Sequence, residues 1–452
     1  MADVSVKRVL VVSNECFSFA TSNGRTLANL LKSFGKKDLA QFYIHGIPEP
    51  SVCSQYYTVS DQDALAAFLC KKQKRLTIHK IVFPEEFSSA PKTEARQTAA
   101  EQGKDEKRQA PAASHGAKVP AEKKIRRSCK NILLRDVVWC SYRWWKRDFS
   151  EFLQEFAPEV VLLQAGDSPF MYAIARKIAR KYHAHLVMFN TESYVLKQVL
   201  YAGVNEKNIW HRLLRHRLRV QYRRFMKQAD FCIYNTQWLE EAYQKAYPHP
   251  GKSRTFYVST DLTPAHAARN EDEFDVTYCG NLGVGRVAPL YELANVLHEA
   301  LPEAKLHIYG KFYSTREQTA FLKLPNVICH GLVPYSQIPD ILASSALVLH
   351  CENPKRVEDL KYAFSTKIAD CLVCGRPFLV YASREYPFVQ YLERFRCAHI
   401  ASTPQELRQL LLQCKDRRFC DSTLENAKRL AEQNHNAQKN SEGMRRALCD
   451  IH

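Results

Sequence analysis

The sequence predicts an α/β protein with two Rossmann-like, doubly wound domains, each a parallel sheet with helices on both faces. Three observations support this prediction. The chain has 452 residues, 46% of them hydrophobic, which is enough to bury more than one core. Short apolar runs of strand length alternate with helical patterns along the chain. This alternation occurs in two series, one in each half of the sequence.

The first series begins near the N-terminus. Val9–Val12 has the character of a buried strand, and Gln41–His45 has the pattern of a second one. A helix is predicted between them, after Ser22–Thr26, because apolar residues recur at helical spacing: Leu27, Leu30, Leu31 and Phe34. Strand, helix and strand in this order predict a parallel sheet.

Charge and hydropathy limit the class of protein. The apolar run Val9–Val12 is too short for a secretory signal, and no run of roughly 18 uncharged apolar residues predicts a membrane span. We therefore expect a cytoplasmic protein, with peripheral contact to the inner face of the plasma membrane as a further expectation. Its net charge of +18 favours a polyanionic partner, such as a nucleoside diphosphate, nucleic acid or anionic lipid.

The composition changes after the first strands. Residues 88–124 are rich in Ala, Lys, Glu, Gln and Pro, which predicts a disordered insertion. The run Ile132–Phe149 mixes basic residues with four large aromatic ones: Trp139, Tyr142, Trp144 and Trp145. It has two interpretations, an interfacial membrane helix or, as we favour, an ordinary helix that leads into the next strand.

Two further strands complete the first series. Val160–Leu163 and His185–Phe189 are apolar runs separated by a helical pattern over Pro169–Tyr182. The loops that follow the strands, Gln164–Ser168 and Asn190–Tyr194, would lie at the C-terminal edge of the sheet. Ligands of open α/β sheets bind at that edge.

A basic helical stretch follows, with no acidic residue between Glu206 and Asp230. It collects six arginines, which are Arg212, Arg215, Arg217, Arg219, Arg223 and Arg224. The stretch Arg212–Arg224 could face an anionic membrane surface or form the solvated side of a helix. No nucleic-acid-binding module accompanies it, so nucleic acid is not expected as a partner.

The second series predicts another doubly wound domain. Its expected strands are Phe231–Tyr234, Phe256–Val258, Asp275–Tyr278, Lys305–Tyr309, Val327–Cys329, Leu347–His350 and Pro377–Tyr381. We place the first domain at residues 1–228, the second at residues 229–400 and C-terminal helices at residues 401–452. The 15 cysteines are scattered, and the Cys371–Cys374 C-x-x-C has no second pair or histidine cluster nearby. Metal binding is therefore not expected.

Two segments of the second series predict phosphate contacts. The loop Gly280–Gly285 allows a close backbone approach to a pyrophosphate, and the adjacent Arg286 can neutralise it. Lys311 follows another predicted strand and can reach the same edge, although it could also face solvent. Each of these features also has a plain structural interpretation as a tight turn or a surface side chain.

The second segment begins at Ser365 and Thr366, which are good N-cap residues for a helix. Lys367 adds a positive charge at that helix start, where the helix dipole disfavours it unless a ligand supplies negative charge. Asp370 lies one turn further on, where its carboxylate could accept hydrogen bonds from a ribose diol. The segment therefore predicts an anion site at a helix N-terminus.

The stretch from about residue 274 to 381 resembles the donor-nucleotide domain of retaining glycosyltransferases with the GT-B fold, most of all the family 4 bacterial cell-surface enzymes. In that family a Gly-Asn-Leu loop opens the nucleotide domain and a nearby basic residue holds the diphosphate. Gly280, Asn281 and Arg286 match that pattern, and Ser365–Pro377 matches the closing motif. The first-loop residues Asn23–Arg25 are also similar to such enzymes.

The resemblance implies two domains facing a cleft, with the donor on the C-terminal domain and the acceptor on the N-terminal one. It implies transfer of a sugar, with retention, from a nucleotide sugar to a glycan or lipid-linked acceptor in polysaccharide biosynthesis. It implies no cofactor and no bound metal. The donor-binding residues that it implies are Gly280, Asn281, Arg286, Lys311, Ser365, Thr366, Lys367 and Asp370.

On the acceptor side, the candidates are Asn14, Asn23 and Gly24, with Asp167 and Glu192 as catalytic candidates. Each has a structural alternative. Asn23 and Gly24 can form a turn, Asp167 can belong to a helix N-cap, and Glu192 can be a solvated loop residue.

One feature departs from the family pattern. Many members carry two glutamates eight positions apart, and here the second corresponds to Asp370 but the first to Tyr362. Glu352 or Asp359 could supply the missing carboxylate, and Glu352 is our third catalytic candidate. Two alternatives stay open, a nucleotide-sugar 2-epimerase of the same fold and a scaffold subunit with a decayed donor site.

Overall fold

The central strands of the first sheet are buried on both faces, because helices cover both sides of the sheet. In β1 (Val9–Val12), Leu10 and Val12 point into one core while Val9 and Val11 point into another on the opposite face. The computed structural model describes residues 6–19, 21–70, 79–84, 128–197, 208–249, 251–264 and 273–451. The insertion expected at residues 88–124 lies outside these ranges.

The first sheet has eight strands among the described residues. Their order across the sheet is β4 (Lys80–Val82), β3 (Gln55–Thr58), β2 (Leu39–Tyr43), β1, β5 (Val160–Gln164), β6 (His185–Asn190), β7 (Phe231–Tyr234) and β8 (Lys252–Thr255). All neighbours pair in parallel except β3 and β4. The helices of this part are α1 (Ser22–Leu31), α2 (Asp61–Phe68), α3 (Cys129–Cys140), α4 (Arg147–Phe156), α5 (Pro169–Tyr182), α6 (Ile209–Met226) and α7 (Gln237–Ala246).

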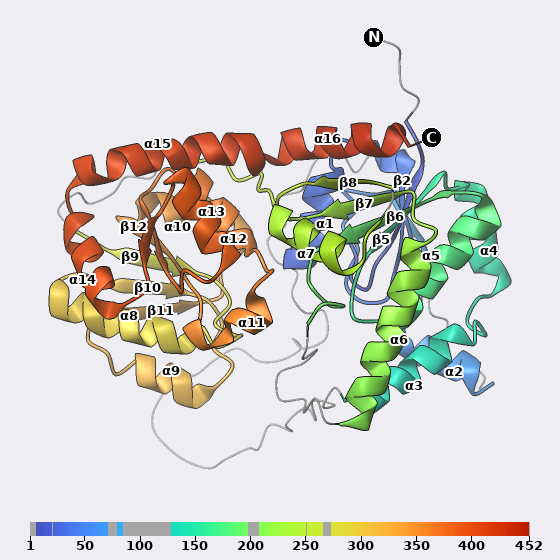
Figure 1. Ribbon diagram of the computed structural model, residues 1–452, viewed down its shortest axis with the longest axis horizontal. Coiled ribbons are helices and arrows are strands. Elements are labelled where there is room, and N and C mark those ends of the chain that lie inside the picture. Colours follow the sequence, from blue (N-terminus) through green and yellow to red (C-terminus); the bar gives the residue numbers. More distant parts are fainter. Residues whose placement is uncertain are drawn as a thin grey trace, which may run out of the picture.

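The second sheet has six parallel strands in the described part of the chain. Their order is β11 (Val327–Gly331), β10 (Leu306–Tyr309), β9 (Val276–Cys279), β12 (Leu347–Cys351), β13 (Phe378–Tyr381) and β14 (His399–Ala401). The helices beside it are α8 (Val287–Ala300), α9 (Thr315–Phe321), α10 (Ile338–Ser344), α11 (Val357–Leu360), α12 (Thr366–Val373), α13 (Pro387–Phe395) and α14 (Pro404–Gln413). Two helix-covered, mainly parallel sheets confirm the predicted fold class (Figure 1).

The sheet boundary differs from the expected change of domain after residue 228. β7 pairs with β6 and β8 pairs with β7, so both belong to the first sheet, although the sequence assigned them to the second series. An apolar strand has the same pattern in either sheet, so the sequence alone could not decide between them. The strand expected at Phe256–Val258 lies just earlier, at β8.

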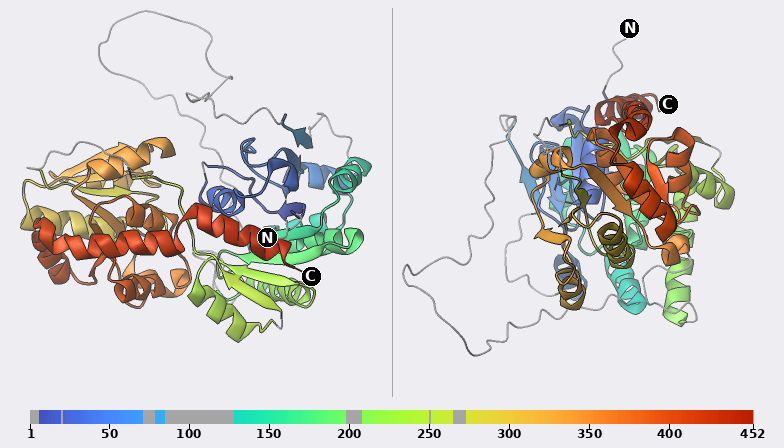
Figure 2. Two further views of the ribbon diagram at one scale, coloured as in Figure 1. Left: turned by 90° about the horizontal axis from the view of Figure 1, so that it is seen from above. Right: turned by 90° about the vertical axis from the view of Figure 1, so that its left-hand side faces the viewer.

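The C-terminal helices connect the two halves of the molecule. α15 (Arg417–Asn434) lies along the second half and α16 (Ala437–Cys449) lies along the first, as two views show (Figures 1 and 2). α16 packs on α1, with Met444 and Leu448 in the same core as Leu27 and Leu31. The residues expected as C-terminal helices therefore bridge both sheets rather than forming a separate unit.

The junction between α15 and α16 is fixed by a buried histidine. His435 ends α15, and its Nδ1 lies 2.7 Å from the carbonyl oxygen of Val258 in the segment between the two sheets. Its Nε2 lies 3.0 Å from the Tyr391 hydroxyl. Burial lowers the pKa of His435 to about 4, so the ring is neutral near pH 7 and serves as a hydrogen-bonding joint.

The tryptophan-rich run is not one continuous helix that exposes its aromatic side chains. It divides into α3 and α4, and Trp139 and Trp144 are buried in the first core. Trp139 stacks on Phe170 with ring centroids 4.9 Å apart. The ordinary structural interpretation of these aromatic residues is therefore confirmed.

Candidate functional site

A cavity of about 780 Å³ lies between the two halves of the molecule. The first half contributes the start of α1, and the second contributes the ends of β9 and β10 and the start of α12. The carboxyl ends of β9 and β10 meet because the strands are adjacent and parallel. Among the predicted donor residues, five line this cavity together with Asp370: Gly280, Asn281, Lys311, Thr366 and Lys367.

Gly280 and Lys367 are in direct contact. A β-carbon at position 280 would lie only 2.1 Å from Cε of Lys367, so the lysine chain occupies the space above the glycine backbone. Gly310 makes a similar approach, since a β-carbon there would lie 2.0 Å from the carbonyl oxygen of Gly280. Gly310 is therefore restricted by a backbone neighbour, whereas a β-carbon at Gly280 would displace only the flexible end of the Lys367 chain.

The ammonium group of Lys367 has no ion-pair partner among the described residues. Its side chain is half-buried at the start of α12. Burial and, after it, the positive charge of Arg286 lower the pKa of Lys367 to about 8, against a smaller opposing effect of Glu352. An anion bound beside Lys367 would relieve both the desolvation and the repulsion.

Arg286 and Ser365 do not line the large cavity. They line a neighbouring space of about 50 Å³, together with His350 and Glu352. Arg286 forms an ion pair with Glu352, through Nε at 3.0 Å from Oε1 and through a second, shorter contact of Nη2. The positive charge that the sequence assigned to the diphosphate is therefore already neutralised by a carboxylate of the same domain.

Glu352 is an ionised, buried partner in this group. Burial by itself would raise its pKa, but hydrogen bonding to His350 and the charge of Arg286 lower it to about 2. His350 Nε2 lies 3.2 Å from Glu352 Oε1, and the His350 side chain is fully buried. The geometry gives Glu352 a structural role in holding Arg286, and its proposed catalytic role stays a prediction.

Asp370 is enclosed by groups from three separate segments. Its Oδ1 accepts hydrogen bonds from Thr260 Oγ1 at 2.7 Å and from the Tyr335 hydroxyl at 2.9 Å. Its Oδ2 lies 3.4 Å from Nη2 of Arg25, which comes from α1 in the first half. The carboxylate expected to bind ribose thus already has partners on both oxygens.

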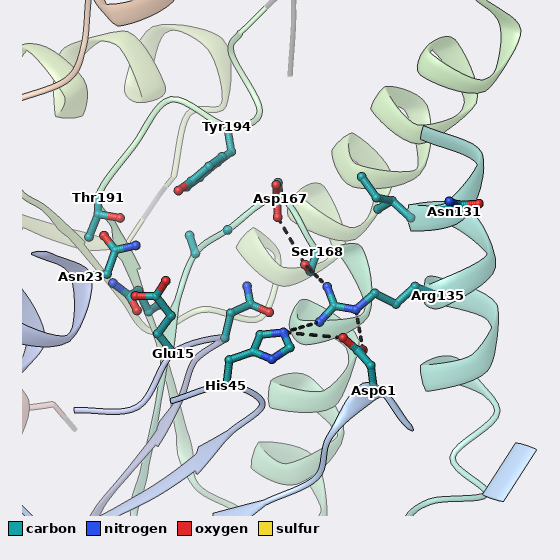
Figure 3. Close-up of a pocket in the computed structure, with 15 residues that line it drawn as sticks. Glu15, Asn23, His45, Asp61, Asn131, Arg135, Asp167, Ser168, Thr191 and Tyr194 are labelled. Carbon is teal, nitrogen blue, oxygen red and sulfur yellow. Dashed lines mark hydrogen bonds and ion pairs between the residues drawn. The ribbon is translucent and has the colours of Figure 1, made fainter. Parts of the chain in front are cut away.

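A second cavity, of about 470 Å³, lies at the C-terminal edge of the first sheet (Figure 3). It brings together Asn14, Asn23 and Asp167, three of the residues predicted for the acceptor side. Glu192 does not line it, although Thr191 and Tyr194 do. Glu192 instead forms an ion pair with Lys197, with Nζ 2.8 Å from Oε2.

Gly24 has a structural function and does not line the cavity of the first sheet. A β-carbon there would lie 2.7 Å from the backbone nitrogen of Ser18 and 2.8 Å from the carbonyl oxygen of Cys16. The glycine lets the loop after β1 cross closely over the first turn of α1. The N-terminus of this helix is capped by Thr21, whose Oγ1 accepts a hydrogen bond from Gly24 N at 3.2 Å.

The cavity of the first sheet also contains a polar cluster that the sequence analysis missed. Arg135 of α3 donates from Nε to Asp61 Oδ1 at 2.6 Å and from Nη1 to Ser168 Oγ at 3.1 Å. His45 Nε2 lies 3.5 Å from Asp61 Oδ2 on the same side (Figure 3). These residues come from segments far apart in the chain, and no local spacing connects them.

The first turn of α1 separates the two cavities. Asn23 lines the cavity of the first sheet, whereas Ser22 and Arg25 line the cavity between the halves. Since the Asn23–Arg25 segment lines both cavities, ligands in the two cavities would approach each other at this helix start.

No helix in the described ranges is long and apolar enough to cross a membrane.

Comparisons with known proteins agree with this architecture. Residues 291–445 match the model of the family described as glycosyl transferase-like. A sequence comparison with curated proteins finds no match. Among solved structures, HepE of Anabaena in complex with UDP and glucose is similar, with a TM-score of 0.61 and 12% identity over 98% of this chain and 100% of that chain.

Two further structures are similar over almost their full lengths. Sucrose-phosphate synthase from Thermosynechococcus elongatus gives a TM-score of 0.58 at 12% identity, covering 97% of each chain. The lipopolysaccharide outer core galactosyltransferase WaaB, in its apo form, gives 0.52 at 12% identity, covering 97% of this chain and 99% of that chain. The chain thus has the GT-B fold of these glycosyltransferases, and its second half carries glycosyl transferase-like sequence.

Proposed function

We propose that this protein transfers a sugar from a nucleoside diphosphate donor to a hydroxyl group of a glycan or lipid-linked acceptor, with retention at the anomeric carbon. The observation that carries the proposal is the half-buried Lys367, which has no described ion-pair partner and faces a cavity shared by both halves. The match of residues 291–445 to a glycosyl transferase-like family supports it. The similar HepE structure holds UDP and glucose.

The donor diphosphate would bind at the start of α12. Lys367 and Lys311 supply positive charge there, and the first turn of α12 supplies the positive end of a helix dipole. Gly280 leaves room for the lysine chain beside its backbone. Arg286 would act on the diphosphate only indirectly. It raises the electrostatic potential around Lys367, while its own charge is paired with Glu352.

The reaction would break the bond between the anomeric carbon and the β-phosphate oxygen. The acceptor oxygen would form its bond to that carbon on the same face, and its proton would pass to the departing diphosphate. Positive charge at the diphosphate stabilises this leaving group as charge develops. We assign that stabilisation to Lys367 and Lys311, and no cofactor or metal is needed for it.

The acceptor would enter through the cavity of the first sheet. Its polar lining suits hydroxyl groups, with amides from Asn14 and Asn23 and a carboxylate from Asp167. Arg135 and His45 add donors at the far side, beside Asp61. Asp167 lines this cavity and we assign it the role of orienting an acceptor hydroxyl, whereas Glu192 is paired with Lys197 outside the lining.

A peripheral membrane surface would suit a lipid-linked acceptor. Apolar side chains are exposed together on the packed helices α3 and α6, and these are Leu134, Val137, Ile209, Trp210 and Leu213. Arg212 is exposed among them, and the ammonium of Lys130 lies 5.7 Å from the centre of the Trp210 ring. We propose that this patch contacts anionic lipid, with apolar groups inserting and basic groups meeting head groups.

The test is thermal denaturation of the purified protein with UDP-, GDP-, dTDP- and CMP-sugars. Selective binding raises the melting temperature by mass action. The effect should be lost in Lys367→Ala and kept in Lys323→Ala, which removes an exposed lysine of the same half outside the cavities. If no nucleotide raises the melting temperature at concentrations of about 1 mM, the donor site is decayed and the scaffold alternative holds.

A second assay separates the remaining enzyme alternative. The nucleotide sugar that binds is incubated without acceptor, and the sugar is analysed by NMR. A transferase leaves the configuration at C2 unchanged, whereas a 2-epimerase inverts it while the sugar stays on the nucleotide. Inversion at C2 would contradict the proposed transfer.

A further inference from the structure

Three soft-ligand side chains converge at the edge of the second sheet, away from both cavities. His399 belongs to the edge strand β14, Cys414 follows the last turn of α14, and Cys420 lies in the first turns of α15. One ligand atom from each residue lies within 4.8 Å of the other two. All three side chains are buried, with exposed fractions of 7%, 5% and 2% in that order.

The histidine of this cluster has an unsatisfied polar atom. Nε2 of His399 is fully buried and has no hydrogen-bond partner within the described ranges. A buried ring nitrogen without a partner costs free energy, so native structures seldom keep one without a ligand or an ordered water. The ring is held in place by stacking on Phe419, with centroids 5.0 Å apart.

We propose that His399, Cys414 and Cys420 form a binding site for a thiophilic cation, with Zn²⁺ as the ion that fits best. Two thiolates and one imidazole are ligands that Zn²⁺ takes in proteins, with a fourth position left for water or another small ligand. Zinc–ligand bonds of about 2.0–2.3 Å require the three atoms to contract slightly around the ion.

Zinc binding would be coupled to the loss of thiol protons. Binding of Zn²⁺ would release the thiol protons of Cys414 and Cys420 to solvent, and His399 would coordinate through Nε2. No electron transfer is involved, so no oxidant or reductant is needed.

The consequence would be mechanical rather than catalytic. The ion would join β14 to the α14–α15 turn, and α15 continues into α16, which packs on the first half of the molecule. A metal at this point would therefore fix the origin of the bridge between the two halves. The spacing of the three ligands is irregular, which explains why no sequence motif revealed them.

The test uses the full-length protein, reduced and stripped of metal with a chelator. Stoichiometric Co²⁺ is added first, because cobalt bound by thiolates gives a near-ultraviolet charge-transfer band and intense visible bands when tetrahedral. We expect one equivalent to bind, Zn²⁺ to displace it, and Zn²⁺ to raise the melting temperature. Absence of the thiolate-to-cobalt band in the wild-type protein would overturn the proposal without any variant.

Variants locate the site. Cys414→Ser, Cys420→Ser and His399→Ala should each lose the cobalt band or shift it, and should lose the Zn²⁺-dependent rise in melting temperature. Cys397→Ser is the matched control, because Cys397 is a buried cysteine of the same half whose Sγ contacts the carbonyl oxygen of Leu392. Equal cobalt spectra in the wild type and the Cys414→Ser/Cys420→Ser double variant would overturn the proposal. Formation of a Cys414–Cys420 disulfide in the presence of Zn²⁺ would also overturn the proposal.

Discussion

Arg25 and Asp370 form an ion pair across the two halves of the molecule, with Nη2 and Oδ2 3.4 Å apart. Both side chains are almost fully buried, exposed by 10% and 7%. The guanidinium of Arg25 also lies 3.9 Å from the centre of the Tyr335 ring, whose hydroxyl donates to Asp370. One contact therefore links α1 to α12 at the wall of the proposed donor cavity.

Breaking this pair should destabilise the protein and change how the halves meet. Removal of one partner leaves the other charge buried and unpaired, which costs about 3 kcal/mol for a well-buried pair. We expect Arg25→Ala and Asp370→Asn to lower the free energy of unfolding in urea by that order. The double variant should be less destabilised than the sum of the two, with a coupling energy of at least about 1 kcal/mol. Additive effects would contradict the pairing.

Gly280→Ala should weaken nucleotide binding without unfolding the protein. The new methyl group would meet the Lys367 chain at 2.1 Å, so the ammonium would have to leave its position. We expect at least about a tenfold loss of donor affinity, the factor that corresponds to about 1.4 kcal/mol. Titration calorimetry with the binding nucleotide measures it. Gly35→Ala is the control, because the added methyl meets only the flexible carboxylate of Asp38.

Nucleotide affinity should fall as pH rises through about 8, the lowered pKa of Lys367. Above that pH the ammonium loses its proton and its attraction for the diphosphate, by up to about tenfold in dissociation constant per pH unit. The stability of the folded protein should instead increase with pH over this range. Between the folded pKa and the ordinary value of 10.5 the unfolded chain binds more protons, so stability rises with pH.

The variant Lys367→Met separates this effect from other titrations. It should bind the nucleotide weakly at every pH and show no change of affinity through about pH 8. Calorimetric dissociation constants between about pH 6.5 and 9.5 give both profiles. A wild-type profile that stays flat over this interval would exclude Lys367 as the diphosphate ligand.

The apolar and basic patch on α3 and α6 should bind anionic vesicles. We expect the protein to co-sediment with phosphatidylglycerol vesicles and to be released by salt, because each basic group near such a surface contributes about 1 kcal/mol. Trp210→Glu should reduce the bound fraction several-fold. Leu322→Glu introduces the same charge at an exposed apolar residue of the second half and should bind normally. Equal binding of both variants would refute the assignment of the surface.

Much of the candidate donor site could be predicted from local sequence. Gly280, Thr366 and Lys367 were expected at strand ends and helix starts, and the structure brings them to one cavity. Strand ends of a parallel sheet meet at one edge, so local patterns suffice for such residues. The pairing of Arg286 with Glu352 could not be predicted in this way, because the two residues are 66 positions apart in the sequence. This ion pair neutralises a charge that the loop pattern assigned to phosphate.

The sequence by itself determined the two series of buried strands, because a strand covered on both faces must be apolar throughout. It also determined the start of α12, because Ser365, Thr366 and Lys367 form a helix beginning that is recognisable locally. Only the tertiary structure decided that β7 and β8 extend the first sheet, since hydrogen-bond partners leave no trace in a strand's own pattern. Only the tertiary structure placed Arg25 beside Asp370 and brought His399, Cys414 and Cys420 close together. Contacts between distant segments depend on how helices and sheets pack in three dimensions, which no local spacing encodes.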